Sequence, residues 1–245
     1  MTTIHWVGDS TVKANGAATW PQTGIGQEFH RYCKPHDVRV EVWAENGRSS
    51  RSFINEGRLV PVAEAIAPGD FLFIQFGHND EKQADPARYT DPAEEFPEFL
   101  AAYVAVARMH GATPVIITPL ARRLFAQRDD DYRHVRWAQA ARDAATRLGV
   151  ALIDLTEASM ALISRVGEEE ARRYYMHLPA GRHAAYPNGQ TDDTHLQPEG
   201  AVAFGGLIAG ALLALGGAYA ALIDPDAAQA LGEAAIDLAQ DAIER

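Results

Sequence analysis

The chain has 245 residues, of which 47% are hydrophobic and 22% charged, as is typical of a folded globular protein and not of a disordered chain. Its 33 acidic residues against 22 Lys and Arg give a net charge of −11. This balance argues against nucleic acid as a partner, because binding phosphates requires a basic surface. We expect one domain over residues 1–245.

Short apolar runs alternate along the chain with longer segments of helical periodicity. The expected strands are residues 3–7, 38–44, 71–76, 115–118 and 151–154. The expected helical segments are residues 24–32, short turns within 49–60, and then 92–110, 131–148 and 156–166.

This alternation predicts an α/β fold with a parallel sheet covered by helices on both faces. The segment 71–76, Phe-Leu-Phe-Ile-Gln-Phe, is almost wholly apolar, as a strand buried on both sides should be. Right-handed crossovers then give a three-layer, flavodoxin-like sandwich, for which we expect five strands in the order 2-1-3-4-5.

The segment 201–223 contains no charged residue and is long enough to span a bilayer. It consists mostly of Ala and Gly, which favour membrane insertion far less than Leu or Ile, and no basic residues flank it closely. We expect a buried core helix and no membrane partner. The acidic, Ala-rich tail from about residue 225 is expected to form a surface helix without chemistry.

The first residues, MTTIHWVGDS, show neither a basic leader nor an apolar signal segment, so we expect a cytoplasmic protein. The single cysteine, Cys33, excludes an internal disulfide. It ends an amphipathic segment, and we expect it to pack in the core, although a nucleophilic role is the alternative.

A serine follows the first expected strand, in the segment Gly8-Asp9-Ser10-Thr11. Ligands of open parallel sheets bind at the carboxyl ends of the strands, so the Ser10 hydroxyl is a candidate nucleophile. Asp and Ser are also favoured helix caps, and capping explains this tetrapeptide equally well when it is taken alone.

The loops after the second and third strands hold candidate donors to an oxyanion. Gly47, within residues 46–48, allows the backbone to approach a ligand closely, although Asn-Gly is also typical of an ordinary turn. Asn79, within residues 77–80, offers a side-chain amide, although an Asn-Asp pair is also common in polar loops.

An acid–base pair lies near the end of the chain, in the segment 192–195. Asp192 and His195 are three positions apart, so one turn of the chain would bring the carboxylate to the imidazole and fix its tautomer. The alternative is that Asp192 caps a turn and His195 is a surface histidine. Each pattern is ordinary alone, but together they supply the groups that acyl transfer requires.

These blocks, in this order, resemble the SGNH hydrolase superfamily, also called GDSL-like esterases. Gly-Asp-Ser-Thr-Val from residue 8, Phe-Gly-His-Asn-Asp from residue 76 and Thr-His at residues 194–195 are more specifically similar to the rhamnogalacturonan acetylesterase family. The resemblance extends from Ile4 to about Leu215.

The resemblance implies an O-acetylesterase of pectic, rhamnogalacturonan-type oligosaccharides. Ser10 would be the nucleophile, His195 the general base and Asp192 its orienting partner. The backbone N–H groups of Ser10 and Gly47 and the Asn79 side chain would form the oxyanion hole. No metal or cofactor would be needed. The alternatives are an SGNH esterase or lipase with another acyl or alcohol preference, and a glycan-binding protein of this fold without turnover.

A pectic substrate would carry carboxylates, with which arginine pairs well. The candidates for such contacts are Arg48, Arg51, Arg122, Arg123 and Arg182. An internal or surface ion pair is the alternative for each of them. His78 is a further candidate for a substrate contact. His177 and His183 precede Asp192 without a third ligand at suitable spacing, so we predict no metal site.

Overall fold

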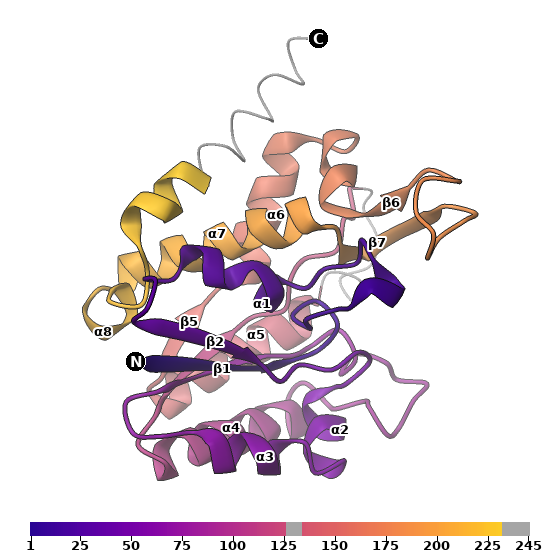
Figure 1. Cartoon of the computed structure of the whole chain (residues 1–245). Helices are drawn as coiled ribbons and strands as arrows, with labels where there is room; N and C mark the ends of the chain where they lie inside the picture. The colour runs from indigo at the N-terminus through magenta and orange to yellow at the C-terminus, as the bar shows by residue number, and fades with distance from the viewer. Residues whose placement is uncertain (126–133, 232–245) are drawn as a thin grey trace.

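The computed structural model describes residues 1–125 and 134–231 and contains a central five-stranded sheet (Figure 1). All its strands are parallel, in the order β2-β1-β3-β4-β5, which confirms the predicted fold class and strand order. The strands are β1 (Thr2–Gly8), β2 (Val38–Val42), β3 (Phe71–Gln75), β4 (Thr113–Ile117) and β5 (Ala151–Ile153).

Helices cover both faces of the sheet, because alternate residues of each strand point to opposite sides and both sets are apolar. On β3, Phe73 belongs to one buried cluster and Ile74 to the other. One layer consists of α2 (Ser50–Asn55), α3 (Leu59–Ala65), α4 (Glu95–Met109) and α5 (Val135–Leu148). The other contains α1 (Ile25–Glu28), α6 (Leu155–Val166) and α7 (Pro198–Leu215).

Helix α7 is the one helix in the described residues that is long and apolar enough to cross a membrane. It packs instead in a layer with α1 and α6, and Phe204, Ile208 and Leu212 are fully buried there. It ends at Gly216, and the short helix α8 (Gly217–Ala220) follows, so the expected single helix over 201–223 is interrupted.

Other boundaries differ modestly from the expectations. Helix α5 begins at Val135, and residues 131–133 of the expected helix lie outside the described part, as do residues 232–245 of the acidic tail. Within the described ranges, short 3-10 helices occupy Ala17–Thr19, Phe29–Tyr32 and Glu170–Tyr174. Cys33 is 5% exposed, which confirms the packing expectation, and burial raises its pKa to about 12.

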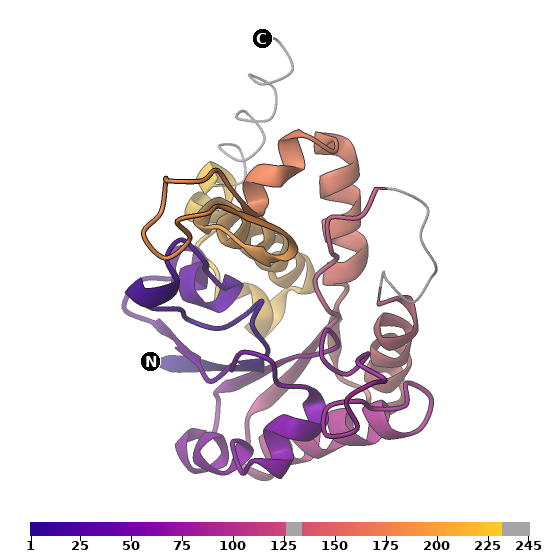
Figure 2. The same ribbon diagram turned by 90° about the vertical axis from the view of Figure 1, so that its right-hand side faces the viewer.

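A two-stranded antiparallel hairpin was not predicted from the sequence. It comprises β6 (Tyr175–Leu178) and β7 (Gln190–Leu196), and it lies beyond the carboxyl ends of the central strands (Figures 1 and 2). Tyr186, in the loop between the two strands, donates a hydrogen bond to the carbonyl of Thr19 at 3.3 Å. The hairpin therefore contacts the segment that follows β1, at the carboxyl end of the sheet.

Candidate functional site

Ser10 lies two residues beyond β1, in a tight turn that begins at Asp9. The carbonyl of Asp9 accepts from the N–H of Val12 and of Lys13, both at 3.1 Å, while its carboxylate accepts from the Thr11 N–H at 2.9 Å. Gly8 allows this turn to start, because a Cβ at that position would stand 2.8 Å from the carbonyl oxygen of Gln75 on β3.

Asp192 and His195 lie on β7, at an irregularity in the hairpin. Tyr175 pairs with Leu196, while the next residue, Met176, pairs with Asp192, so residues 193–195 are inserted as a bulge. The turn of the chain between Asp192 and His195 is thus a strand bulge. The Asp192 carboxylate stabilises the bulge by accepting the N–H groups of Thr194 at 2.7 Å and His195 at 3.0 Å.

The bulge directs the His195 ring toward the turn after β1. His195 Nε2 lies 2.9 Å from Ser10 Oγ, and His195 Nδ1 lies 2.7 Å from Asp192 Oδ2. A carboxylate only accepts hydrogen bonds, so Nδ1 carries the proton and Nε2 offers its lone pair to the serine hydroxyl. This is the hydroxyl–imidazole–carboxylate arrangement that activates a serine.

Electrostatics keep Asp192 ionised. Burial by itself would raise the pKa of this carboxyl, but the hydrogen bond and charge of His195, together with the two N–H groups of the bulge, outweigh that effect. The pKa of Asp192 therefore lies well below its usual value. An ionised carboxylate beside Nδ1 is what stabilises an imidazolium at His195 during proton transfer.

Two residues that line the pocket have backbone N–H groups without a partner among the described residues. Gly47 has φ +75°, a left-handed conformation that glycine adopts without strain, and it lines the same pocket as Ser10. Within residues 1–125 and 134–231, the N–H groups of Ser10 and Gly47 make no hydrogen bond. Unpaired N–H groups in a pocket are suited to an oxyanion.

The side-chain amide of Asn79 lines this pocket as well and is held in a fixed orientation. Its Nδ2 donates to the carbonyl of Arg48 at 3.2 Å, and its Oδ1 accepts from Arg88 at 3.5 Å. The amide nitrogen carries two hydrogens, so one remains for a ligand. The structure thus brings together Ser10, Gly47, Asn79, Asp192 and His195, although they come from four separate segments of the chain.

The pocket has a volume of about 300 Å³. All of its lining residues except Gly47 have polar or charged side chains: Ser10, Asn46, His78, Asn79, Lys82, Arg122, Asp192, Thr194 and His195. These side chains can hydrogen-bond a hydrophilic ligand.

A buried pair of histidines adjoins the pocket. The rings of His78 and His134 meet edge to face with centroids 4.1 Å apart, and a Glu81 carboxylate oxygen lies 2.7 Å from His134 Nδ1. Burial, and then the charges of His134 and Arg122, lower the pKa of His78 well below its usual value. His78 is therefore neutral at the pocket wall.

The candidate arginines are distributed differently from the expectation. Arg122 lines the pocket and also pairs with Glu81 at 2.6 Å. Arg48 and Arg182 do not line it: Arg48 is bound to Glu56 at 2.9 Å, and Arg182 is exposed in the hairpin loop. Contact of these two arginines with a substrate stays a prediction.

Two further arginines and a histidine are engaged by other side chains. Arg51 pairs with Glu95, and Arg123 lies 3.3 Å from Asp193. His177 contacts Asp193 at 2.8 Å. Among the described residues, no group of three or more His, Cys, Asp or Glu side chains could hold a metal ion.

Sequence reasoning missed Asn46, Lys82 and Thr194 as pocket residues. Lys82 follows Asn79 in the same loop, and its ammonium forms no ion pair within the described ranges. The available signal was the spacing: Lys82 is three residues beyond Asn79 in one loop. Two residues at that spacing in a curved loop can face the same pocket. Burial, and then the charges of Arg88 and Arg122, lower the pKa of Lys82.

Comparison with known proteins places this chain among ester hydrolases. The model of the GDSL-like Lipase/Acylhydrolase family matches residues 6–203. The Probable rhamnogalacturonan acetylesterase YesY of Bacillus subtilis is 37% identical over 218 residues, covering 87% of this chain and 93% of that protein. Rhamnogalacturonan acetylesterase RhgT of the same organism is 36% identical over 214 residues, covering 87% and 90%. The crystal structure of YxiM from Bacillus subtilis superposes with a TM-score of 0.71 at 26% identity, covering 87% of this chain and 56% of that one.

Proposed function

Because this chain belongs to the GDSL-like lipase/acylhydrolase family and is a carboxylic-ester hydrolase, we propose that it removes acetyl groups from carbohydrates through an acetyl-Ser10 intermediate. The observation that carries the proposal is the line of contacts from Ser10 Oγ through the His195 ring to the Asp192 carboxylate. The Ser10 and Gly47 N–H groups and the Asn79 amide, all at the same pocket, add to its support.

In the first half of the reaction, Ser10 Oγ attacks the acetyl carbonyl carbon and its proton passes to His195 Nε2. The carbonyl oxygen becomes an oxyanion that accepts hydrogen bonds from the Ser10 and Gly47 N–H groups and from Asn79 Nδ2. As the tetrahedral centre collapses, the ester C–O bond breaks and the sugar oxygen takes the proton from His195. In the second half, water attacks the acetyl group in the same way, acetate leaves and Ser10 regains its proton.

Two observations support an acetyl group and a carbohydrate alcohol. Nine of the ten residues that line the pocket have polar or charged side chains, which can hydrogen-bond a sugar alcohol. YesY is named a probable rhamnogalacturonan acetylesterase, and RhgT a rhamnogalacturonan acetylesterase. The alternative is an esterase of longer acyl chains. A second pocket of about 120 Å³ supports it, because this pocket shares Arg122 with the first and has apolar lining residues. These are Leu124, Phe125, Met160 and Ile163.

We further propose pectic, rhamnogalacturonan-type oligosaccharides as the substrate class. Such chains carry uronate carboxylates, and the cations Lys82 and Arg122 line the pocket in a protein of net charge −11. Burial is the largest cause of the lowered pKa of Lys82; the charges of Arg88 and Arg122 add to it, and those of Glu81 and Asp85 oppose it. Cations that line a pocket attract an anionic substrate.

The experiment is to measure acetate released from a panel of acetylated pectic oligosaccharides, acetylated xylan and simple sugar acetates, with 4-nitrophenyl acetate, butyrate and octanoate as an acyl series. We expect the highest kcat/KM on pectic acetates and a decline with acyl length. The Ser10→Ala variant should fold normally and lose at least about a thousandfold in kcat. Unchanged turnover by that variant, or a preference for octanoate, contradicts the proposal.

A further inference from the structure

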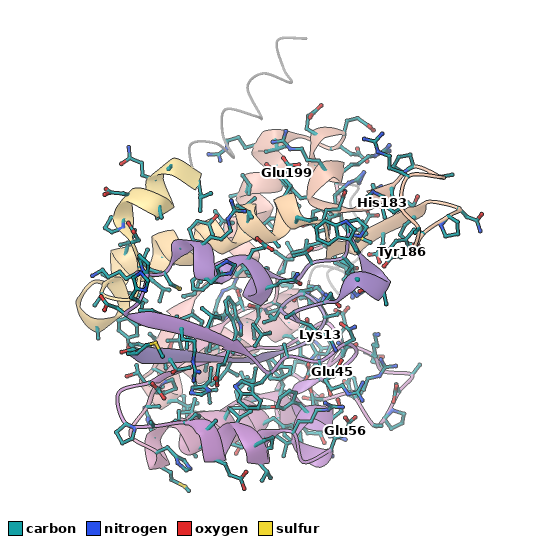
Figure 3. All side chains as sticks on the ribbon, viewed as in Figure 1. Lys13, Glu45, Glu56, His183, Tyr186 and Glu199 are labelled. Carbon is teal, nitrogen blue, oxygen red and sulfur yellow. The ribbon has the colours of Figure 1, made fainter. Side chains whose placement is uncertain are left out.

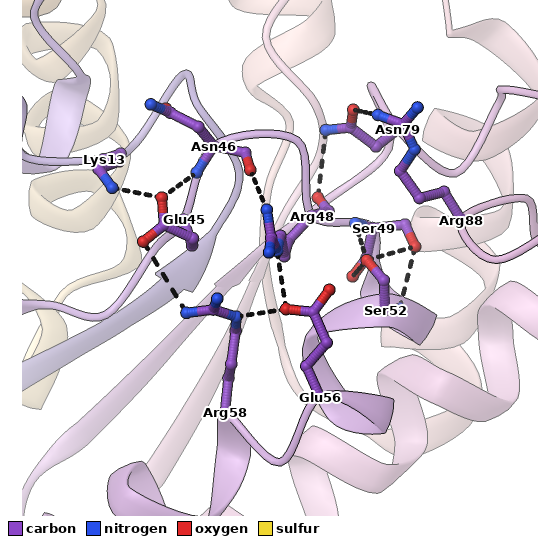
Figure 4. Close-up of polar contacts among 10 residues, drawn as sticks. All are labelled: Lys13, Glu45, Asn46, Arg48, Ser49, Ser52, Glu56, Arg58, Asn79 and Arg88. Carbon is purple, nitrogen blue, oxygen red and sulfur yellow. Dashed lines mark hydrogen bonds and ion pairs between the residues drawn. The ribbon is translucent and has the colours of Figure 1, made fainter. Parts of the chain in front are cut away.

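The residues on either side of Gly47 belong to a closed ring of contacts (Figure 4). It lies on the same side of the molecule as the hairpin residues His183 and Tyr186 (Figure 3). The ring, called the loop ring from here on, consists of Glu45, Asn46, Arg48, Glu56 and Arg58. Asn46 lines the pocket, whereas Glu56 and Arg58 do not. The loop ring therefore extends beyond the pocket.

Arg48 contacts the peptide that joins Asn46 to Gly47. The Asn46 carbonyl and the Gly47 N–H belong to one planar trans unit, so they point in opposite directions. Arg48 Nη1 donates to the Asn46 carbonyl at 2.8 Å. By holding that oxygen, the guanidinium fixes the direction of the Gly47 N–H. A cation on the carbonyl also polarises the peptide and strengthens its N–H as a donor.

Glu56 holds the Arg48 guanidinium and is itself held by Arg58. Arg48 Nε donates to Glu56 Oε2 at 2.9 Å, and Arg58 Nε donates to the same oxygen at 2.7 Å. Arg58 Nη1 lies 3.8 Å from Glu45 Oε2, and Glu45 Oε1 accepts the Asn46 N–H at 2.8 Å, which closes the ring. Each side chain that positions the turn is thus positioned by another.

The loop ring is also connected to Asn79 and to the turn that carries Ser10. The Arg48 carbonyl accepts from Asn79 Nδ2, so one residue contacts both the Gly47 peptide and the Asn79 amide. Lys13 forms an ion pair with Glu45, and its own N–H donates to the Asp9 carbonyl in the turn that presents Ser10. The three expected oxyanion donors therefore share one polar network.

We propose that Arg48 is a positioning residue of the oxyanion hole, and that Glu56 and Arg58 hold its guanidinium in place. The inference rests on the proposed function, because it assumes that the Gly47 N–H faces the reacting carbonyl. A surface ion-pair network with only a structural role is worth little in stability and would leave the rate of the chemical step unchanged. The two roles therefore predict different results.

The test uses the full chain, with 4-nitrophenyl acetate as a neutral substrate. Arg48→Met removes the guanidinium and keeps much of the length of the side chain, while Glu56→Ala releases the guanidinium at an exposed site that folding tolerates. Glu98→Ala is the matched control, because Glu98 is an exposed glutamate of α4 that pairs with Arg147 at 3.2 Å and does not line the pocket. Glu56→Gln keeps one acceptor and serves as the conservative variant.

We expect kcat to fall about tenfold or more in Arg48→Met and several-fold in Glu56→Ala, with KM within about twofold, because an oxyanion donor acts in the transition state. Glu56→Gln should recover part of the loss, and Glu98→Ala should match the parent. Methylboronic acid, whose adduct with a serine places an oxygen in the oxyanion hole, should bind more weakly by about the same factor as kcat falls.

An unchanged kcat in both ring variants, a change in KM alone, or an equal loss in Glu98→Ala overturns the inference. So does a loss of kcat with unchanged binding of methylboronic acid. Thermal unfolding of every variant identifies any that does not fold. If Arg48→Met does not fold, the kcat of Glu56→Ala tests the inference instead. If Ser10→Ala is inactive but the ring variants behave as the parent, only this inference fails. If Ser10→Ala retains turnover, the proposed function fails and the inference with it.

Discussion

His195 Nε2 lies 2.9 Å from Ser10 Oγ, although 185 positions separate the two residues in the chain. The contact joins the turn after the first strand to a bulge in the last one. The bulge inserts residues 193–195 between two pairs of a hairpin, and this insertion turns the imidazole out of the strand toward the serine. The reactivity proposed for Ser10 therefore depends on an irregularity in β7, a strand outside the central sheet.

Asp192→Asn should lower kcat by about 10⁴-fold without unfolding the protein, because the amide no longer holds the His195 ring in the tautomer that accepts the serine proton. KM should change little. Asp193→Asn is the control, because that neighbouring carboxylate pairs with His177 and Arg123 instead. Steady-state kinetics on 4-nitrophenyl acetate measure the difference, and equal rates for the two variants would contradict the assignment of Asp192.

Asn79→Ala should lower kcat by about 10²- to 10³-fold, because one donor to the oxyanion is lost. KM should stay within about threefold, since the oxyanion forms only near the transition state. Kinetics with the neutral aryl acetate separate the two quantities. A rise in KM with kcat preserved would show instead that Asn79 binds the ground state of the substrate.

Lys82→Gln should raise KM about two- to fivefold for acetylated oligosaccharides that contain uronates, the range of an exposed charge pair. KM for neutral sugar acetates should not change, and added salt should weaken the difference between the two substrate types. Lys34→Gln, remote from the pocket beside Leu222, is the control. An equal effect on charged and neutral substrates would remove the carboxylate contact from the proposal.

Asp80→Asn should change how stability depends on pH. Asp80 is fully buried, and burial raises its pKa to about 7 despite hydrogen bonds from Ser50 and Thr90. Since the usual pKa is about 4, the native state binds more protons than the unfolded state between about pH 4 and 7. This carboxyl therefore lowers the free energy of unfolding as pH rises through that window.

The amide that Asp80→Asn introduces cannot ionise, so the variant should gain stability relative to the parent as pH rises, by at most about 4 kcal/mol. At low pH the variant should be less stable than the parent, because the amide does not reproduce the hydrogen bonds that the carboxyl makes. Urea unfolding at several pH values gives the difference, with the exposed Asp143→Asn as control. A constant difference between about pH 4 and 7 would mean that Asp80 keeps its usual pKa.

The sequence by itself determined the sheet and the kinds of group at its edge. Strand β3 is apolar at every position but Gln75, so it had to be buried on both faces, and its alternation with helical segments required parallel crossovers. Parallel strands end at a common edge, and this rule alone brought the loops of Ser10, Gly47 and Asn79 together.

Only the tertiary structure decided the partners of the individual side chains. Arg48 and Arg122 look alike in the sequence, yet one is turned behind the Gly47 turn by Glu56 and the other lines the pocket. The sequence did not predict the hairpin bulge that contains Asp192 and His195 either. Its strands are short, and its contact with Ser10 joins residues far apart in the chain. Periodicity reports which face of an element is buried, whereas the partner of a charged side chain depends on distances between elements that a linear pattern does not contain.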